Sequence, residues 1–189
     1  MLNWQELEDK ISQCNNCPLH SGRTNVVLGR GNRNADILLI GEGPGEEEDQ
    51  RGEAFVGAAG RLLDQLLCAL GFDMDDIYIA NIVKCRPPGN RVPTDQEALA
   101  CMGYLRNQAY LVRPRIIVCM GATASKYVLR EKDLKITRER GIMREKNGYH
   151  YMPTFHPAAL LRDPAKKIDM YNDFKKVMEL YEKLKKEGT

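Results

Sequence analysis

The sequence predicts an α/β fold built on a parallel sheet. Four short apolar runs alternate along the chain with stretches whose apolar residues recur at helical spacing. Strands that alternate with helices pair in parallel, because each helix returns the chain to the side of the sheet where the next strand begins. The 189 residues show no break in composition, so we expect a single domain over residues 1–189, with a cysteine-bearing N-terminal segment and a C-terminal helix.

The four apolar runs are the predicted strands. Three consist mostly of aliphatic residues, as strands buried on both faces do. The fourth contains Pro153, which predicts an edge strand because proline has no amide hydrogen to donate, and the turn dipeptide Asn147-Gly148 precedes it. The expected strands are Asp36–Gly41, Ile77–Lys84, Arg115–Gly121 and Tyr151–Phe155.

The predicted helices carry their own start and stop signals. Asn3 with Glu6, and Thr94 with Glu97, have the spacing of a capping box. One helix places its leucines on a single stripe and ends at Gly71. Besides a short helix after Asn3, the expected helical stretches are Gly60–Gly71, Thr94–Leu111, Ala122–Leu129 and Lys166–Thr189.

Composition and charge limit the class of protein. No apolar run reaches the length of a membrane-spanning helix, and the first residues, MLNWQELEDK, do not form a signal peptide. We therefore expect a cytoplasmic protein that does not bind membranes. The net charge of +2 is close to neutral, so a nucleic-acid partner would require a local basic patch.

Polar residues gather at the carboxyl ends of the predicted strands, where ligands bind in sheets of this kind. Gly41–Glu48 follows the first strand, Asn81 lies within the end of the second, Gly121 ends the third and His156 follows the fourth. We therefore expect one crevice that collects a glycine-rich loop, carboxylates, an amide and an imidazole. A lone histidine is more often structural, but its place at a strand end favours a functional role for His156.

The glycine-rich segment GEGPGEEEDQRGEAFVG, Gly41–Gly57, does not match the known phosphate-binding loops. Glu46 stands where a dinucleotide fingerprint needs its third glycine, and Pro44 removes an amide donor. No Gly-Lys-Ser/Thr sequence follows, which excludes a P-loop. Two interpretations stay open: a tight turn with solvated acids, or a loop around a flat neutral ligand with Glu42 or Glu48 turned inward.

Six cysteines in a cytoplasmic chain indicate metal binding more than disulfides. Two residues separate Cys14 from Cys17, and fifteen separate Cys85 from Cys101. Thiolates this close in sequence suit zinc or an iron–sulfur cluster, and spacing alone does not decide between them. We expect Cys68 and Cys119 to be buried thiols without such a role.

Apolar and basic residues beside the strand ends predict contacts with a nucleic acid. Leu160 and Leu161, next to Arg162, either wedge into a base stack or cover the core. Five arginines fall in segments that leave strand ends, where they either hold a phosphate backbone or form solvated surface. They are Arg86, Arg91, Arg138, Arg140 and Arg162.

Together these motifs resemble one known family. The segments GEGPGEEED, AFVG, NIVKCRPP and PTFHPAALLR, with the four-cysteine pattern, are similar to the family 4 uracil-DNA glycosylases from about Cys14 to Arg162. The resemblance implies a three-layer α/β/α sandwich around a four-stranded parallel sheet, with a [4Fe–4S] cluster. It also implies a monofunctional N-glycosylase that flips uracil out of DNA and excises it by hydrolysis, which leaves an abasic site.

The resemblance assigns the cluster and the base-binding residues. The implied cluster ligands are Cys14, Cys17, Cys85 and Cys101. Phe55 matches the ring that stacks on uracil, and Asn81 matches the amide that reads the edge of the base. Glu48 matches a residue that lies near C5 of uracil, where thymine carries its methyl group.

Catalytic and DNA-contacting residues are expected beside these. His156 matches the histidine beside uracil O2, and Glu42 with Gly43 matches the loop on the water side. Gly43 stands where family 1 enzymes have a catalytic aspartate, so Glu42 is the expected residue for orienting water or stabilising the sugar cation. The expected DNA contacts are Arg86, Arg140, Leu161 and Arg162.

The expected partner is uracil-containing DNA, single- or double-stranded, bound by a monomer that acts on the prokaryotic nucleoid. One alternative is a protein that traps uracil-DNA covalently, but ITRERGIM, Ile136–Met143, lacks the reactive histidine that such proteins carry before the last strand. A second alternative is an iron–sulfur or zinc protein with a redox or regulatory role. A phosphate or nucleotide hydrolase is disfavoured by the acidic loop.

Overall fold

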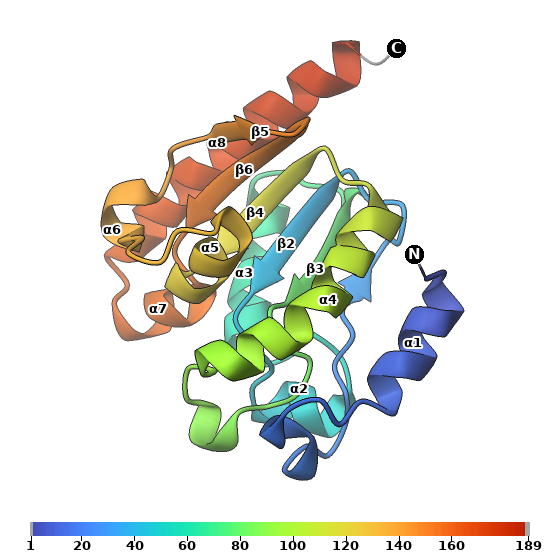
Figure 1. Cartoon of the computed structure of the whole chain (residues 1–189). Helices are drawn as coiled ribbons and strands as arrows, with labels where there is room; N and C mark the ends of the chain where they lie inside the picture. The colour runs from blue at the N-terminus through green and yellow to red at the C-terminus, as the bar shows by residue number, and fades with distance from the viewer. Residues whose placement is uncertain (1, 188–189) are drawn as a thin grey trace.

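A computed structural model describes residues 2–187 as an α/β fold around one mixed sheet (Figure 1). Six strands form the sheet in the order β1-β3-β2-β4-β6-β5. The four central strands run parallel, and each outer strand is antiparallel to its neighbour. The strands are β1 (Arg30–Gly31), β2 (Ile37–Gly41), β3 (Ile77–Asn81), β4 (Ile116–Met120), β5 (Arg144–Lys146) and β6 (Tyr149–Thr154).

Eight α-helices lie before, between and after these strands in the described part of the chain. They are α1 (Trp4–Ser12), α2 (Glu46–Arg51), α3 (Ala58–Ala69), α4 (Asp95–Val112), α5 (Ala122–Leu129), α6 (Ile136–Glu139), α7 (Pro157–Arg162) and α8 (Lys166–Glu187). Short 3₁₀ turns cover Pro18–Ser21, Met74–Asp76 and Pro88–Asn90. Within residues 2–187, no helix combines the length and the hydropathy that crossing a bilayer requires.

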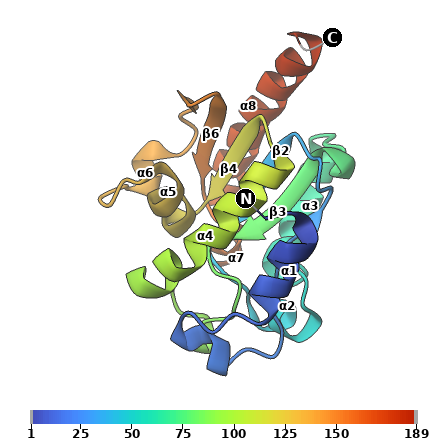
Figure 2. The ribbon, with the colours of Figure 1, turned by 45° about the vertical axis from the view of Figure 1, so that its right-hand side comes forward.

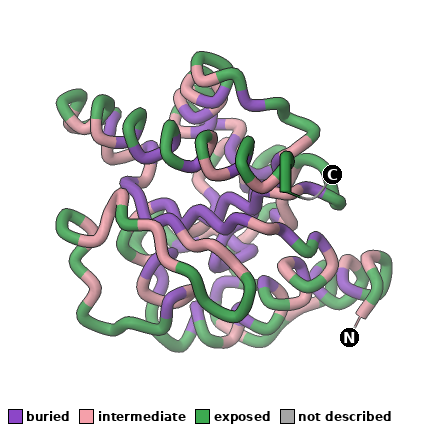
Figure 3. Tube along the Cα trace, turned by 90° about the horizontal axis from the view of Figure 1, so that it is seen from above, coloured by how far each residue is buried: buried purple, intermediate pink, exposed green. Residues whose placement is uncertain are grey.

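Helices cover both faces of the sheet (Figures 1 and 2). Strand residues such as Leu39 pack with α3, α7 and α8 on one face, and Leu38 with its neighbours packs with α4 and α5 on the other. Every residue of β2, β3 and β4 is buried, as predicted for strands covered on both sides. Seen from above, buried positions follow the strands through the centre and exposed positions lie on the outer helices (Figure 3).

The four predicted strands are confirmed as the parallel centre of the sheet, but the expectation of a purely parallel four-stranded sheet is wrong. Two short antiparallel strands, β1 and β5, extend it at both edges. The edge position predicted for Tyr151–Phe155 is also wrong, because β6 lies between β4 and β5. Pro153 is tolerated there since β5 pairs only with Tyr149–Tyr151, and Pro153 lies beyond that paired stretch.

Local signals in the sequence are mostly confirmed. Both predicted capping boxes form, at the starts of α1 and α4. Asn147 and Gly148 have φ of 53° and 78°, the positive values that a tight hairpin turn between β5 and β6 requires. The second predicted strand ends earlier than expected, at Asn81, and the last two residues of the predicted C-terminal helix lie outside the described residues.

Candidate functional site

Gly41 ends β2, Asn81 ends β3 and His156 follows β6. Because these strands are parallel, the three residues lie at the same end of the sheet. Gly41 and Asn81 are partners in the register of β2 and β3. A Cβ atom added to Gly41 would lie 2.5 Å from Asn81 Oδ1 and 2.5 Å from Cζ of Phe55. The missing side chain at Gly41 therefore leaves the space in which Asn81 and Phe55 meet.

Phe55 is held in an unusual backbone conformation at this meeting point. Its φ is 56°, in the left-handed region that non-glycine residues rarely adopt and that clusters at ligand-binding sites. Gly60 permits the conformation, since a Cβ there would lie 1.7 Å from the Phe55 carbonyl oxygen. The buried Phe55 ring lies beside the His156 ring, with centroids 5.6 Å apart and planes 34° apart. The two rings thus pack against each other at the carboxyl ends of the strands.

Asn81 and His156, which both lie near Phe55, each carry a buried polar atom without a partner in the described part of the chain. Asn81 Oδ1 and His156 Nε2 are buried and have no hydrogen-bond partner among residues 2–187. Buried polar atoms are normally hydrogen-bonded, because an unpaired one costs roughly 1–3 kcal/mol. Two such atoms beside one aromatic ring indicate a place for a small polar ligand that pairs with both.

The protonation of His156 follows from its position at the start of α7. Its Nδ1 accepts a hydrogen bond from the Ala158 amide at 3.1 Å, so the neutral ring carries its proton on Nε2. Burial, together with the positive charge of Arg162, lowers the pKa of His156 to about 4. At neutral pH the ring is therefore an uncharged donor through Nε2.

A carboxylate, that of Glu42, follows Gly41 directly on the loop after β2. Glu42 Oε2 accepts a hydrogen bond from the hydroxyl of Thr123, in the first turn of α5. The Glu42 carbonyl accepts from the Val83 amide at 3.2 Å, which ties the loop to the segment after β3. At Gly43 an added Cβ would come within 2.7 Å of the Val83 side chain, so the loop packs closely there. Glu42 is therefore fixed through both its backbone and its side chain.

The acids that follow the glycine loop form the first turn of α2, where negative charge favours a helix N-terminus. Glu48 accepts hydrogen bonds from the Gly45 amide at 3.1 Å and the Gly57 amide at 2.8 Å. Its carboxylate thereby joins the two ends of the segment that contains Phe55. Asp49 is buried and accepts from the Thr24 amide. These two acids are structural partners of backbone amides, and not solvated charges.

The four expected metal ligands meet in one place. Cys14, Cys17, Cys85 and Cys101 line a single small cavity, together with Arg23 and Lys84. Three segments far apart in sequence supply these thiols: the turn after α1, the loop after β3 and α4. Burial raises the pKa of the Cys101 thiol to about 11, although Lys84 opposes the increase. Bound metal would lower such a pKa, since metals bind thiolates.

The donor set of this cavity fits an iron–sulfur cluster. Among residues 2–187, no group of three or more His, Cys, Asp or Glu side chains has the arrangement of a metal site. A four-iron cluster takes four cysteine thiolates, and four cysteines are the residues that line this cavity. Of the other two cysteines, Cys119 is buried in β4 as expected, but Cys68 is exposed on α3, against expectation. The leucine stripe of α3 faces the core, and Cys68 falls outside it.

Lys84 is the least expected member of this region. Its side chain is 1% exposed, and its ammonium donates to the Asn81 carbonyl at 2.8 Å. Burial lowers the pKa of Lys84 to about 8, and the charge of Cys101 opposes the decrease. Arg23 also contacts these cysteines, donating to the Cys14 carbonyl at 2.9 Å and to Cys85 Sγ at 3.4 Å. Two cations therefore border the cysteine cavity.

The candidate DNA-contacting arginines differ in how much of their charge is already paired. Arg140 donates to the fully buried Asp173 and to the Asp169 carbonyl, which is not the exposed position expected of a phosphate contact. Arg91 forms two hydrogen bonds with Glu97 and lowers the pKa of that carboxyl to about 2. Arg86, Arg138 and Arg162 remain on the surface or near it. Of these, Arg86 lies 3.5 Å from Glu46.

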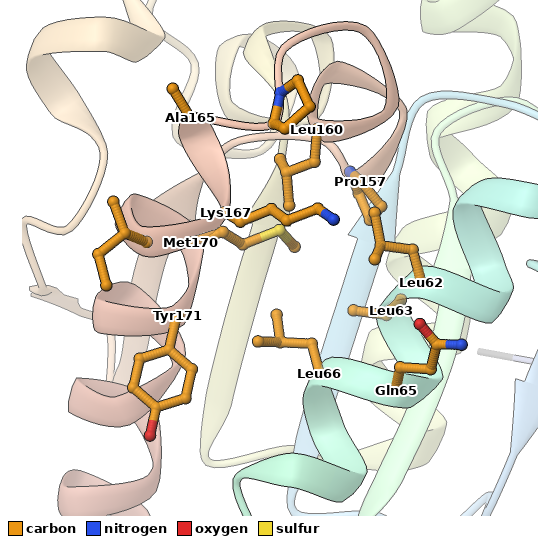
Figure 4. Close-up of a pocket in the computed structure, with 12 residues that line it drawn as sticks. Leu62, Leu63, Gln65, Leu66, Pro157, Leu160, Ala165, Lys167, Met170 and Tyr171 are labelled. Carbon is orange, nitrogen blue, oxygen red and sulfur yellow. The ribbon is translucent and has the colours of Figure 1, made fainter.

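The residues of α7 divide between core and surface. Leu160 is buried in the core, whereas Leu161 is half-exposed and Arg162 is exposed. Leu160 also borders an apolar cavity of about 620 Å³ between α3, α7 and α8, which Figure 4 shows with Leu62, Leu66 and Met170 around it. Pro157, next to His156, lines the same cavity. Leu160 therefore covers the core, and only Leu161 and Arg162 are placed to meet a partner.

Sequence patterns did not reveal three residues that the structure brings to the site. Thr123, which binds Glu42, follows a strand-ending glycine, and that position is the only signal it gives. Lys84 and Arg23 look like ordinary surface cations in the sequence, and only the fold shows that they border the cysteines. A lysine directly before a cysteine of the metal pattern is the one hint for Lys84.

Comparisons with known proteins show which family the chain resembles. A family model described as the uracil DNA glycosylase superfamily matches residues 28–185. The type-4 uracil-DNA glycosylase of Thermotoga maritima is 43% identical over 185 residues, which cover 96% of this chain and 95% of that protein. The type-4 uracil-DNA glycosylase of Archaeoglobus fulgidus is 40% identical over 187 residues, which cover 95% of this chain and 94% of that protein. That of Saccharolobus solfataricus is 42% identical over 187 residues, which cover 95% of this chain and 87% of that protein.

Proposed function

This chain belongs to the uracil-DNA glycosylase superfamily, with type-4 enzymes as its relatives, and we propose that its crevice binds a uracil flipped out of DNA. The chain is a uracil-DNA glycosylase: it hydrolyses the N-glycosidic bond of uracil in DNA and acts in DNA repair. In this proposal the fold is a three-layer α/β/α sandwich, which helices on both faces of the sheet support.

The single observation that carries the site assignment is the pair of unpaired buried atoms, Asn81 Oδ1 and His156 Nε2, beside Phe55. Uracil offers a donor at N3 and an acceptor at O2, so it satisfies both atoms at once. The Phe55 ring stacks on the flat face of the base. Cytosine has no hydrogen on N3 and would leave Asn81 Oδ1 unpaired, which excludes it at a cost of roughly 1–3 kcal/mol. In this proposal Glu48, whose carboxylate is held by the Gly45 and Gly57 amides, lies near C5 and takes the space that the methyl group of thymine would need.

Excision requires that the bond between C1′ of the sugar and N1 of uracil breaks. The electron pair stays with N1, which leaves an anionic base and an oxocarbenium-like sugar, as in other glycoside cleavages. The Nε2–H group of His156 donates a hydrogen bond to O2 and so stabilises the negative charge of the leaving base. This stabilisation is strong because the site is buried. Water then adds to C1′ while Glu42 orients it and accepts its proton. Thr123 holds the Glu42 carboxylate in place for this step.

The four cysteines are proposed to hold a [4Fe–4S] cluster. The support is the donor set: four thiols line one small cavity that two cations border. When bound, the cluster supplies structural cross-links between the N-terminal segment, the loop after β3 and α4. None of the steps above needs an electron from it.

We propose Arg86, Leu161 and Arg162 as DNA contacts. Leu161 is half-exposed on a short helix whose first residue follows His156, so it is placed to enter the base stack beside a flipped uracil. Arg140 no longer belongs to this set, because Asp169 and Asp173 bind its guanidinium. The proposed setting is a monomer acting in the cytoplasm on nucleoid DNA, with single- and double-stranded DNA as substrates.

The experiment is incubation with a duplex that carries one uracil, followed by alkaline cleavage of abasic sites. We expect strand scission at the uracil position and none on the matched duplex with cytosine. If an iron-loaded protein released no uracil, that result would contradict the proposal and would favour a redox or regulatory role.

A further inference from the structure

We propose that Lys84 is a positioning residue that couples the cysteine site (Cys14, Cys17, Cys85 and Cys101) to Asn81, the base-reading end of β3. This inference rests on the proposed cluster and on uracil excision, and it adds a connection between them. The buried ammonium of Lys84 donates to the Asn81 carbonyl, its charge acts on the Cys101 thiol, and Lys84 lines the cavity of the four cysteines.

The first step concerns the charge that balances Lys84. A buried ammonium is costly unless a negative group lies near it. The structure shows no ion pair between Lys84 and a carboxylate in residues 2–187, and the charged group that acts on Lys84 is Cys101, with which it lines the cysteine cavity. Four thiolates around a cluster carry net negative charge, which supplies the missing counter-charge. Lys84 is therefore expected to stabilise the bound cluster as well as itself.

The second step concerns what the other end of Lys84 holds. Its ammonium donates to the carbonyl of Asn81 at 2.8 Å, and Asn81 is the last residue of β3. The segment between Asn81 and Lys84 is hydrogen-bonded to the end of β2, since the Ile82 amide donates to the Gly41 carbonyl at 2.9 Å. The turn that carries the Asn81 side chain into the crevice is thus anchored by a cation. If that cation is lost, the turn can shift relative to Gly41 and Phe55.

Arg23 provides a matched contrast to Lys84. It is a second cation at the cysteine site, with its Nη1 3.4 Å from Cys85 Sγ. Its other hydrogen bonds go to the carbonyls of Cys14 and Ser12, and none reaches Asn81. Removing Arg23 therefore weakens the charge balance of the cluster without touching the base-reading turn.

The experiment compares Lys84→Met and Arg23→Met with the wild-type holoenzyme. Cluster release under a chelator is followed by loss of visible absorbance, and uracil excision is measured under single-turnover conditions at equal iron content. Both variants should release iron faster, by about tenfold or more, because each loses a cation beside a buried anionic group. Only Lys84→Met should also lose excision, by about tenfold, with unchanged affinity for DNA.

Two further variants guard against a folding defect. Lys84→Arg keeps the positive charge and should restore iron retention and part of the excision rate. If Lys84→Met does not fold, Lys84→Gln, which removes the charge but keeps a polar donor, is expected to lose iron faster than wild type. Iron loss from Lys84→Gln at the wild-type rate would overturn the coupling.

Failure of the proposed function is distinguishable from failure of this inference. A wild-type protein that holds iron but releases no uracil would overturn both. A wild-type protein that releases uracil, beside an iron-loaded Lys84→Met variant that excises it equally fast, would overturn the role of Lys84 alone. Equal loss of excision in the Arg23→Met variant would also contradict it, since Arg23 does not contact Asn81.

Discussion

The hydroxyl of Thr123 donates a hydrogen bond to the carboxylate of Glu42, which joins the first turn of α5 to the loop after β2. Thr123 and Glu42 are 81 residues apart in the sequence, and the parallel pairing of β2 with β4 brings them together. The hydrogen bond fixes one carboxylate oxygen of Glu42 and thereby sets the orientation of the carboxylate group. The proposed role of Glu42, to orient water, depends on such fixation, because misplacement of a reacting group by about 1 Å can cost roughly a hundredfold in rate.

The first prediction is that Thr123→Val lowers the single-turnover rate of uracil excision by about tenfold, while binding to uracil-DNA changes little. Valine keeps the shape of threonine but removes the donor. Thr123→Ser, which restores the hydroxyl, should recover most of the rate. A valine variant as fast as wild type would show that the bond does not position Glu42.

The second prediction concerns pH and His156. In the unfolded chain its pKa is about 6.5, and in the folded protein burial and Arg162 lower it to about 4. As the pH falls below about 6.5, the unfolded state therefore binds a proton that the folded state does not. The contribution of His156 to the free energy of unfolding is fully present above that pH and is lost as the pH falls toward about 4.

Urea unfolding at about pH 7 and about pH 5 checks this sign, with His156→Gln as the comparison. Wild type should lose more stability than the variant between these two values. The difference between the two proteins isolates His156 from the other titrating groups. An equal pH dependence in both proteins would show that His156 titrates normally.

Much of the fold could be predicted because the parallel strands are aliphatic runs. The two edge strands could not: β1 has two residues and β5 reads Arg-Glu-Lys, so neither carries a hydrophobic pattern. They form because an edge of the sheet offers free hydrogen-bonding groups, which any short extended segment can pair with. Whether a strand that contains Pro153 can lie inside the sheet also depends on how far β5 pairs with β6. The sequence of β6 alone does not reveal the length of that pairing.

The position of a candidate residue was predictable where it lies at the end of an aliphatic strand, as Asn81 does at the end of β3. Arg140 was not, because its partner Asp173 lies 33 residues away on α8, and a charged residue in a sequence does not reveal a buried partner. Lys84 shows the same limit. A lysine in a sequence predicts a solvated surface, and only the packing of the cysteine site around it explains its burial.

The third prediction tests the surface of α7. Leu161→Ala and Arg162→Ala should weaken excision from paired duplex more than from single strands, because extrusion from a duplex must overcome a few kcal/mol of stacking and pairing. Leu99→Ala is the matched control, since Leu99 is also an exposed leucine, on α4. Single-turnover rates on both substrates give the comparison. Equal losses on the two substrates would argue against a wedge.

The fourth prediction concerns the cysteine site. The protein purified without oxygen should be brown and carry four irons per chain, and Cys85→Ser should lose iron and thermal stability together. Cys68→Ser should keep both, because Cys68 is exposed on α3 and lies outside the cavity. Metal analysis with one zinc per chain and no iron would contradict the assignment.

The last prediction concerns the base that the crevice reads. Asn81→Asp removes the amide donor and leaves only acceptors, so uracil O4 faces a carboxylate oxygen, and each mismatched group costs roughly 1–3 kcal/mol. Asn172→Asp, on the exposed side of α8, makes the same change of charge away from the crevice. The decisive measurement is single-turnover excision from matched oligonucleotides that carry uracil or cytosine. Asn81→Asp should lose about tenfold to a hundredfold on uracil while Asn172→Asp stays near wild type. Wild-type uracil excision by Asn81→Asp would contradict the assignment of this crevice as the uracil site.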